Sequence, residues 1–182
     1  MHCWKSIDII RNGEFYRKFL ISAIISLSVF IFLYIPINLM YVEQLHDDYF
    51  YLLLIGILLI YPVHKVTHIF PLLRHRKHLS FELTRYFYIL PVMQVKIEEP
   101  IKKMTFVRSL LYPFIFINML LIIGGFLFPY YIHYFIILIA YHTGICTNDF
   151  IYVKHLLLAP KNSYIEESDQ AYKILLKEQA VI

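Results

Sequence analysis

The Lys and Arg residues of this chain leave two long apolar intervals that contain no basic residue. All 17 of them fall in three blocks, Lys5–Lys18, Lys65–Arg108 and Lys154–Lys177. The intervals between the blocks are residues 19–64 and 109–153. A helix needs about 20 apolar residues to cross a hydrocarbon core roughly 30 Å thick, so each interval has room for two crossings. The chain is therefore predicted to cross a membrane four times.

The predicted fold is an all-α integral membrane protein of a single domain, residues 1–182, with its four transmembrane helices arranged as two helical hairpins. Its predicted segments are spans at residues 19–39, 49–70, 109–128 and 130–152, an excursion at 71–108 and a tail at 153–182. We expect the tail to contain at most one short helix.

The distribution of charge predicts the orientation of these helices. Cytoplasmic loops collect Lys and Arg, so the three basic blocks should share the cytoplasmic side. The first turn on the other side, residues 43–48, has three carboxylates and no basic residue, and the second, around Pro129–Ile132, is almost uncharged. Tyrosines flank both turns, as expected at the level of the lipid headgroups. We expect a multi-pass protein of the cell (plasma) membrane with both termini in the cytoplasm.

The composition excludes a soluble enzyme. Hydrophobic residues make up 59% of the chain and charged residues only 16%, which would leave a soluble protein of this size with too much exposed apolar surface. We interpret the net charge of +4 as a determinant of orientation, helped by anionic lipid, and expect no nucleic-acid partner. Cys3 and Cys146 are both expected near the reducing cytoplasmic side, so no disulfide is expected.

The excursion between the second and third spans has its own pattern. Val95 and Ile97 alternate with polar residues, which indicates a strand within Val92–Glu98, and Leu90-Pro91 suits a turn. We therefore predict a small cytoplasmic β-hairpin. Glu98-Glu99-Pro100 then has the acidic residues and the proline of a helix start.

A basic cluster opens the excursion and supports a hypothesis of its own. Arg74, Arg76 and Lys77 lie directly after the second span, where each basic residue gains about 1 kcal/mol near an anionic leaflet. They are candidates for binding anionic lipid or a membrane or cytoplasmic protein, which would make the chain an adaptor. The alternative is that they only enforce topology.

The end of the second span carries the strongest chemical signal. His64 and His68 are four residues apart, so they share one helix face and their imidazoles can hold one metal ion. A zinc protease helix of the HExxH type has a Glu after the first His, and that Glu takes the proton from the metal-bound water. Here the position is occupied by Lys65, whose ammonium accepts no proton at neutral pH. A lone histidine pair of this spacing at a membrane interface is more often an amphipathic anchor.

The fourth span adds further candidate ligands. Asp149 lies at the predicted depth of the histidine pair, and a carboxylate there needs a partner, which is either this site or Lys154. His142 and Cys146 are also four residues apart, and zinc accepts both imidazole and thiolate. They are candidate additional ligands, although a core histidine and a small buried cysteine are the simpler interpretation. Asn118 in the third span should face the helix bundle.

Several short elements follow one another in a recognisable order. They are the pair His64 to His68, the strand segment Val92–Glu98, the helix entry Pro100-Ile101-Lys102-Lys103, the element Leu111-Tyr112-Pro113-Phe114, the sequence Asn148-Asp149-Phe150 and the closing Pro160-Lys161. The order resembles the "putative zincin peptidase" family of small bacterial membrane proteins, which is distantly similar to site-two-type metalloproteases. The resemblance covers roughly Tyr49–Tyr172.

The resemblance implies a zinc ion and makes Asp149 a third ligand beside His64 and His68. Lys65 is the departure from the family pattern, and it falls on the residue that hydrolysis needs most. The favoured hypothesis is a zincin-like membrane protein that keeps its metal ligands and is catalytically impaired. The alternative is an active intramembrane peptidase with another base, either a desolvated, neutral Lys65 or Glu82.

Overall fold

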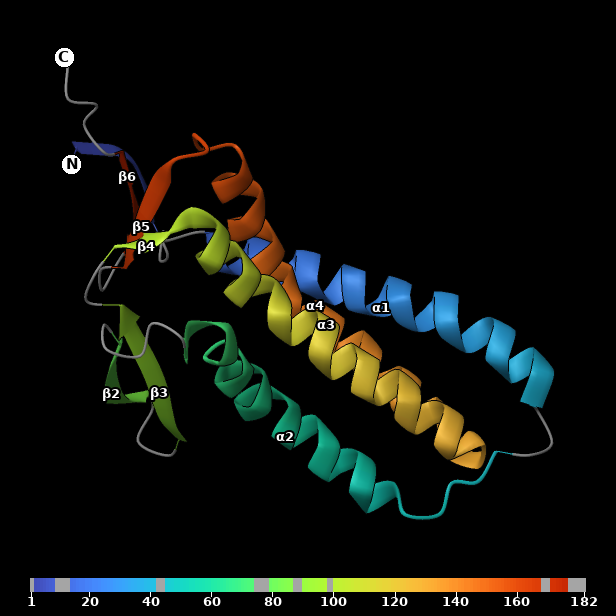
Figure 1. Ribbon diagram of the computed structural model, residues 1–182. Coiled ribbons are helices and arrows are strands. Elements are labelled where there is room, and N and C mark those ends of the chain that lie inside the picture. The colour runs from blue at the N-terminus through green and yellow to red at the C-terminus, as the bar shows by residue number, and fades with distance from the viewer. Residues whose placement is uncertain are drawn as a thin grey trace.

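Four long helices dominate the computed structural model (Figure 1). They are α1 (Glu14–Tyr41), α2 (Phe50–Thr67), α3 (Lys103–Leu127) and α4 (Ile132–Leu157). The structure describes the chain except for residues 1, 9–13, 42–44, 74–78, 87–89, 98–99, 168–170 and 177–182.

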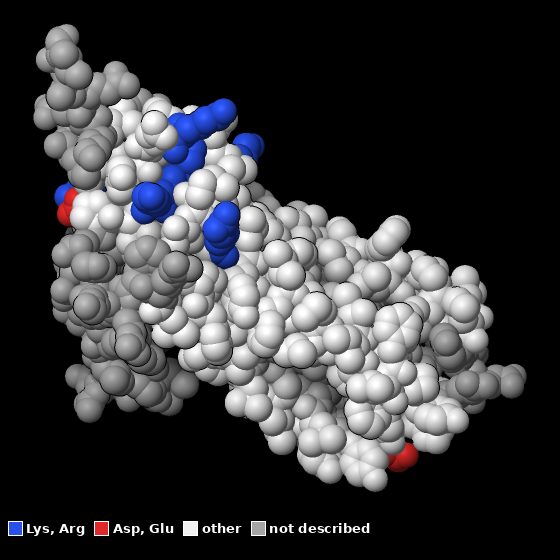
Figure 2. Space-filling model, in the orientation of Figure 1, with Lys and Arg blue, Asp and Glu red and all other residues white. Residues whose placement is uncertain are grey.

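All four helices are long and apolar enough to cross a membrane, as predicted. Their surfaces expose large apolar side chains along their length, including Phe32 on α1, Leu58 on α2 and Phe126 on α3, each more than 70% exposed. Such side chains are costly in water and suit a surface that faces lipid. In Figure 2 the Lys and Arg side chains gather at one end of the visible face, while the remainder of the helical surface is almost free of charge. The chain is therefore a membrane protein by its helices and by its surface.

Helix α4 is the centre of the bundle. It packs against α1, α3 and α2, and α1 lies along α4 rather than pairing with its neighbour in sequence, α2 (Figure 1). The expectation of two helical hairpins is therefore met by α3 and α4 but is wrong for α1 and α2. A small-residue contact explains this packing, because a Cβ added at Gly144 of α4 would lie 3.0 Å from Ser26 Cβ and 3.1 Å from the Ser22 carbonyl oxygen of α1. Small residues four apart let two membrane helices approach closely.

Two antiparallel sheets lie at the same end of the molecule. One is a hairpin of β2 (Leu79–Tyr86) and β3 (Leu90–Ile97), which confirms the hairpin predicted between the second and third spans. Pro91 was expected in the turn, but it lies within β3, paired with Arg85. The strand therefore begins two residues earlier than expected, at Leu90 instead of Val92.

The second sheet has four strands in the order β1, β6, β5, β4. Its strands are β1 (His2–Asp8), β4 (Ile101–Lys102), β5 (Ser163–Glu167) and β6 (Ala171–Leu176). The sheet thus joins both ends of the chain to the segment that precedes α3, as Figure 1 shows. Residues 163–167 and 171–176 of the tail form strands instead of the short helix that was expected, and the N-terminal lead contains the strand β1.

The helix boundaries also differ from the predicted spans. Helix α3 begins at Lys103, after β4, instead of at the acidic residues before Pro100, and α4 continues to Leu157. Helix α2 ends at Thr67 and gives way to a tight turn through Leu73. Lys103 explains how the α3 start meets the α4 end: its buried Nζ donates a hydrogen bond of 2.7 Å to the Ala159 carbonyl oxygen. A cation beside a helix C-terminus is also favoured by the helix dipole.

A compact core beneath the four-stranded sheet holds these parts together. It contains Ile101 of β4, Phe106 and Leu110 of α3, Leu156 of α4 and Ile165 of β5, each at most 6% exposed. Residues from strand, helix and tail therefore pack into one cluster. Its position directly beyond the ends of α3 and α4 sets the depth at which the polar residues of α4 meet α2.

Candidate metal centre

The polar residues of α2 lie at its last turn and face α4. His64 is 2% exposed, and His68 is the C-cap residue that directly follows Thr67. Ser109 of α3 secures this end, since its Oγ donates a hydrogen bond of 2.8 Å to the His68 carbonyl oxygen, which has no partner within the helix. The histidine pair is therefore held by α3 as well as by its own helix.

Asp149 of α4 meets both histidines. Its Oδ2 lies 3.2 Å from His64 Nε2 and 3.6 Å from His68 Nε2, and the two Nε2 atoms are 3.1 Å apart. The three residues form one of the groups whose ligand atoms lie close enough to share an ion. Bonds of about 2.0–2.1 Å to a tetrahedral zinc separate two ligand atoms by about 3.3 Å, so the observed triangle matches zinc.

The neighbours of His68 determine which of its ring nitrogens has a lone pair. His68 Nδ1 lies 2.9 Å from the Ser109 carbonyl oxygen, which can only accept a hydrogen bond. The proton of the neutral ring is therefore on Nδ1, and Nε2 presents its lone pair to Asp149. Histidines that bind metals usually donate their other N–H to such a partner, which fixes the tautomer and the ring orientation.

His142 has the same kind of support on the other side of His64. Its Nδ1 lies 3.0 Å from Asn118 Oδ1, an acceptor, so its Nε2 has the lone pair and faces His64 Nδ1 at 3.2 Å. His64 thus lies between two lone pairs, one on each neighbouring histidine. When His64 donates Nδ1–H to His142, its own Nε2 lone pair joins those of His68 and Asp149.

In this arrangement three acceptor atoms, His64 Nε2, His68 Nε2 and Asp149 Oδ2, face one another with no hydrogen atom to share. Asp149 Oδ2 is buried and has no hydrogen-bond partner, although two imidazole nitrogens lie within 3.6 Å of it. A buried carboxylate oxygen without a donor is unfavourable by several kcal/mol or neutralised. A cation at the centre of the triangle satisfies all three atoms, so the residues fit the zinc ion that a zincin requires.

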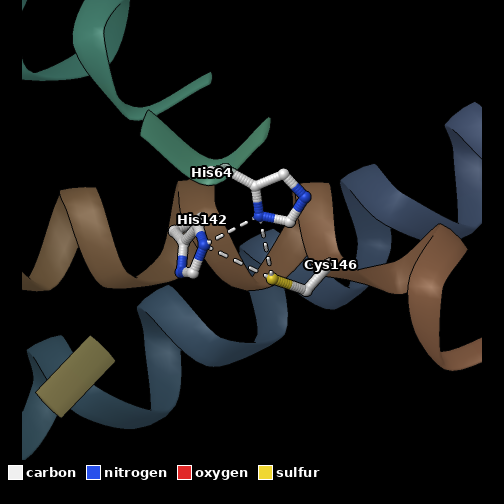
Figure 3. A group of neighbouring side chains, drawn as sticks. All are labelled: His64, His142 and Cys146. Atoms are coloured by element: carbon white, nitrogen blue, oxygen red, sulfur yellow. Dashed lines mark hydrogen bonds between the residues drawn. The ribbon is translucent and has the colours of Figure 1, made fainter. Parts of the chain in front are cut away.

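A second group of ligand atoms uses the other nitrogen of His64 (Figure 3). Cys146 Sγ lies 3.4 Å from His142 Nε2 and 3.8 Å from His64 Nδ1. Figure 3 shows the thiol and the two rings directed toward one another between α2 and α4. The candidate ligands His142 and Cys146 therefore lie beside His64, but on the side away from His68 and Asp149.

The structure brings together every candidate metal ligand named from the sequence, and it adds two outer partners. Asn118 faces the bundle as expected, and its contact with His142 emerges only from the packing of α3 on α4. Ser109 was not anticipated, since it acts partly through its backbone carbonyl, which has no sequence signal. Glu82, Arg74, Arg76 and Lys77 lie outside the side chains that the structure describes.

Lys65 has an exposed side chain in the folded chain. Its Nζ lies 5.9 Å from the centre of the Tyr61 ring, one turn earlier on α2. Among the described residues, Asp149 is the one carboxylate grouped with the histidine pair.

The unsatisfied carboxylate leads to a test with the metal removed. In chelator-treated protein, Asp149→Asn should raise the free energy of unfolding by about 1 kcal/mol. The reason is that the amide N–H can donate a hydrogen bond to the Nε2 lone pair of His64 or His68. Thermal unfolding in detergent measures this change, with Asn148→Ala on the exposed side of the same helix as control. A lower stability of Asp149→Asn would show that the carboxylate has a structural donor and would argue against a metal centre.

The comparisons with known proteins agree with this geometry. The model of the family described as "Putative zincin peptidase" matches residues 57–164, from the middle of α2 to the start of β5. No curated protein and no solved structure gave a match. The matched segment contains both histidines of the pair, Asp149 and all the outer partners described above. The chain belongs to the family described as putative zincin peptidases.

Proposed function

We propose that this protein is a zincin-like multi-pass membrane protein that binds one zinc ion through His64, His68 and Asp149 and has lost peptide hydrolysis. The observation that supports zinc binding is the convergence of the three acceptor atoms, with Asp149 Oδ2 buried and without a donor. Three protein ligands leave a fourth position open, as in catalytic zinc sites. A zinc ion bound there supplies a Lewis acid for a carbonyl oxygen or a water molecule.

The loss of hydrolysis follows from the residue beside the histidine pair. A zincin needs a carboxylate at this position to remove a proton from water, a contribution of about 10²–10⁴-fold to the rate. Lys65 offers three N–H donors and no acceptor in its charged form, so it cannot take that proton. The remaining contacts orient the candidate ligands: Ser109 holds the His68 ring and Asn118 holds His142. Metal binding is therefore preserved while proton removal is not.

Zinc content is the first measurement. Detergent-purified protein, chelated and then reloaded, should hold about one zinc per chain, and His68→Ala and Asp149→Ala should each lose it. Zinc at 100 times its Kd should raise the free energy of unfolding by about 2.7 kcal/mol, since it binds only the folded chain. Asn148→Ala is the matched control and should bind zinc as the wild type does. Equal zinc in the wild type and in Asp149→Ala would exclude this site.

The impaired hydrolysis is tested separately, with unfolded, fluorescently labelled casein as a general protein substrate. The zinc-loaded wild type should release no more fluorescence than the chelated protein, because the base is missing. Any cleavage gained by Lys65→Glu should disappear when His68→Ala is added. Chelator-sensitive cleavage by the wild type, absent from His68→Ala, would show an active peptidase with another base.

We also propose that both termini and both sheets lie in the cytoplasm of a cell whose plasma membrane holds the four helices. The basic residues at the sheet end support this orientation (Figure 2). The exposed thiol of Cys3 lies in β1 at that end, and the exposed His46 lies beside Tyr130 in the turns at the other end. The bundle thus offers one natural labelling site on the proposed inner side.

A membrane-impermeant maleimide applied to intact cells tests the orientation. Cys3 should be labelled only after the cells are opened, whereas a cysteine introduced by His46→Cys in a Cys3→Ala background should be labelled at once. Cys146 is fully buried and should not react in either case. Labelling of Cys3 in intact cells would reverse the proposed topology.

A further inference from the structure

The group His64, His142 and Cys146 is separate from the proposed zinc ligands in all but one residue (Figure 3). We propose that these three side chains form a second metal site, which takes a soft monovalent ion, Cu(I), through His64 Nδ1, His142 Nε2 and Cys146 Sγ. The site lies between α2 and α4, where Asn118 of α3 supports His142.

The distances suit coordination by two imidazoles and a thiolate. The two nitrogens are 3.2 Å apart, and the sulfur lies 3.4 Å and 3.8 Å from them. Zinc, with bonds of about 2.0–2.1 Å to nitrogen and about 2.3 Å to sulfur, holds such atoms about 3.3 Å and 3.5 Å apart, which gives the scale for a first-row metal bound by these ligands. Small movements of the thiol are enough to complete the geometry.

Both histidines already have the outer partners that a metal ligand requires. His142 donates Nδ1–H to Asn118 Oδ1, which directs its Nε2 lone pair at the site. If His64 binds an ion through Nδ1, its proton lies on Nε2, which faces Asp149 Oδ2 at 3.2 Å. A carboxylate that accepts the outer N–H of a metal-bound histidine is a common arrangement. Asp149 then has the donor that it otherwise lacks.

Burial and the thiolate favour Cu(I). His64 is 2% exposed, and His142 and Cys146 are completely buried, so solvent does not compete for the ligand atoms. Cu(I) bound to the Cys146 thiolate and two neutral imidazoles forms an uncharged centre, and the charge of Asp149 is stabilised by the N–H that His64 donates to it. Binding replaces the thiol proton, which leaves to solvent, and no oxidation is involved. Thiolate ligands also select Cu(I) over harder ions.

The shared histidine links the two sites. A neutral imidazole has one lone pair, so His64 serves either the group with Asp149 or the group with Cys146 at a given time. The ligands that are not shared, His68 on one side and Cys146 on the other, therefore distinguish the two sites. Each can be removed while the other site keeps all of its ligands.

The experiment measures both metals in the full-length protein in detergent, in a Cys3→Ala background that removes the exposed thiol. Cu(I) affinity is measured without oxygen, by competition with a coloured Cu(I) chelator, and zinc content is measured in parallel. The background protein should bind about one Cu(I) per chain. Cys146→Ala should weaken Cu(I) binding at least about 100-fold, since even outer partners of metal ligands contribute 10–100-fold. His68→Ala should retain Cu(I) and lose zinc.

Cobalt(II) provides a second measurement that a merely structural cysteine would not affect. A thiolate-to-cobalt charge-transfer band in the near ultraviolet should appear in His68→Ala and be absent from Cys146→Ala. Circular dichroism and gel filtration verify that each variant is folded. The proposal is overturned if the folded background protein binds no Cu(I), or if Cys146→Ala binds Cu(I) as tightly as its parent. Absence of zinc from the background protein itself, with Cu(I) binding intact, would instead refute the proposed zinc site.

Discussion

Polar groups inside a membrane-spanning bundle must be satisfied by one another, because no lipid can hydrogen-bond them. In this protein the requirement falls on α4, which contributes His142, Cys146 and Asp149 to the buried interior. Their partners come from α2 and α3, so these contacts also determine how three helices are rotated. The chain of contacts ends at Asp149 Oδ2, which has no donor among the described residues. A metal ion is the simplest partner that completes it.

The position of these polar side chains depends on how α4 packs at its middle and at its C-terminal end. On one face Gly144 lets α1 approach closely, and at the C-terminal end Lys103 and the core beneath the sheet hold α4 against α3. These contacts are apolar or involve backbone carbonyls, and none of them belongs to a metal-binding motif. The site is therefore held in place by residues that bind no metal themselves.

His64 is the one residue that belongs to both groups of ligand atoms. Its two nitrogens face different neighbours, so the position of one proton decides which group presents three free ligand atoms. In a zincin the second nitrogen of a zinc-binding histidine is normally held by a fixed acceptor. Here the acceptor is itself a histidine beside a thiol, so His64 belongs to two groups of candidate ligands, which the HxxxH pattern does not reveal.

The sequence by itself determined the class of the protein and the candidate ligands. Apolar runs of about 20 residues between basic blocks predict membrane-spanning helices whatever the arrangement of those helices. Histidines four residues apart on a helix share one of its faces. It did not determine the four-stranded sheet, because the pairing of β1 with β6 joins segments more than 160 residues apart and neither has a strong local pattern. Nor did it determine which helices pack, whether His64 meets Asp149, or which nitrogen faces which partner. Those depend on the rotation and depth of each helix. Close contacts such as Gly144 with Ser26 set them, because large apolar residues surround most of each helix and hydrophobicity alone does not select the buried face.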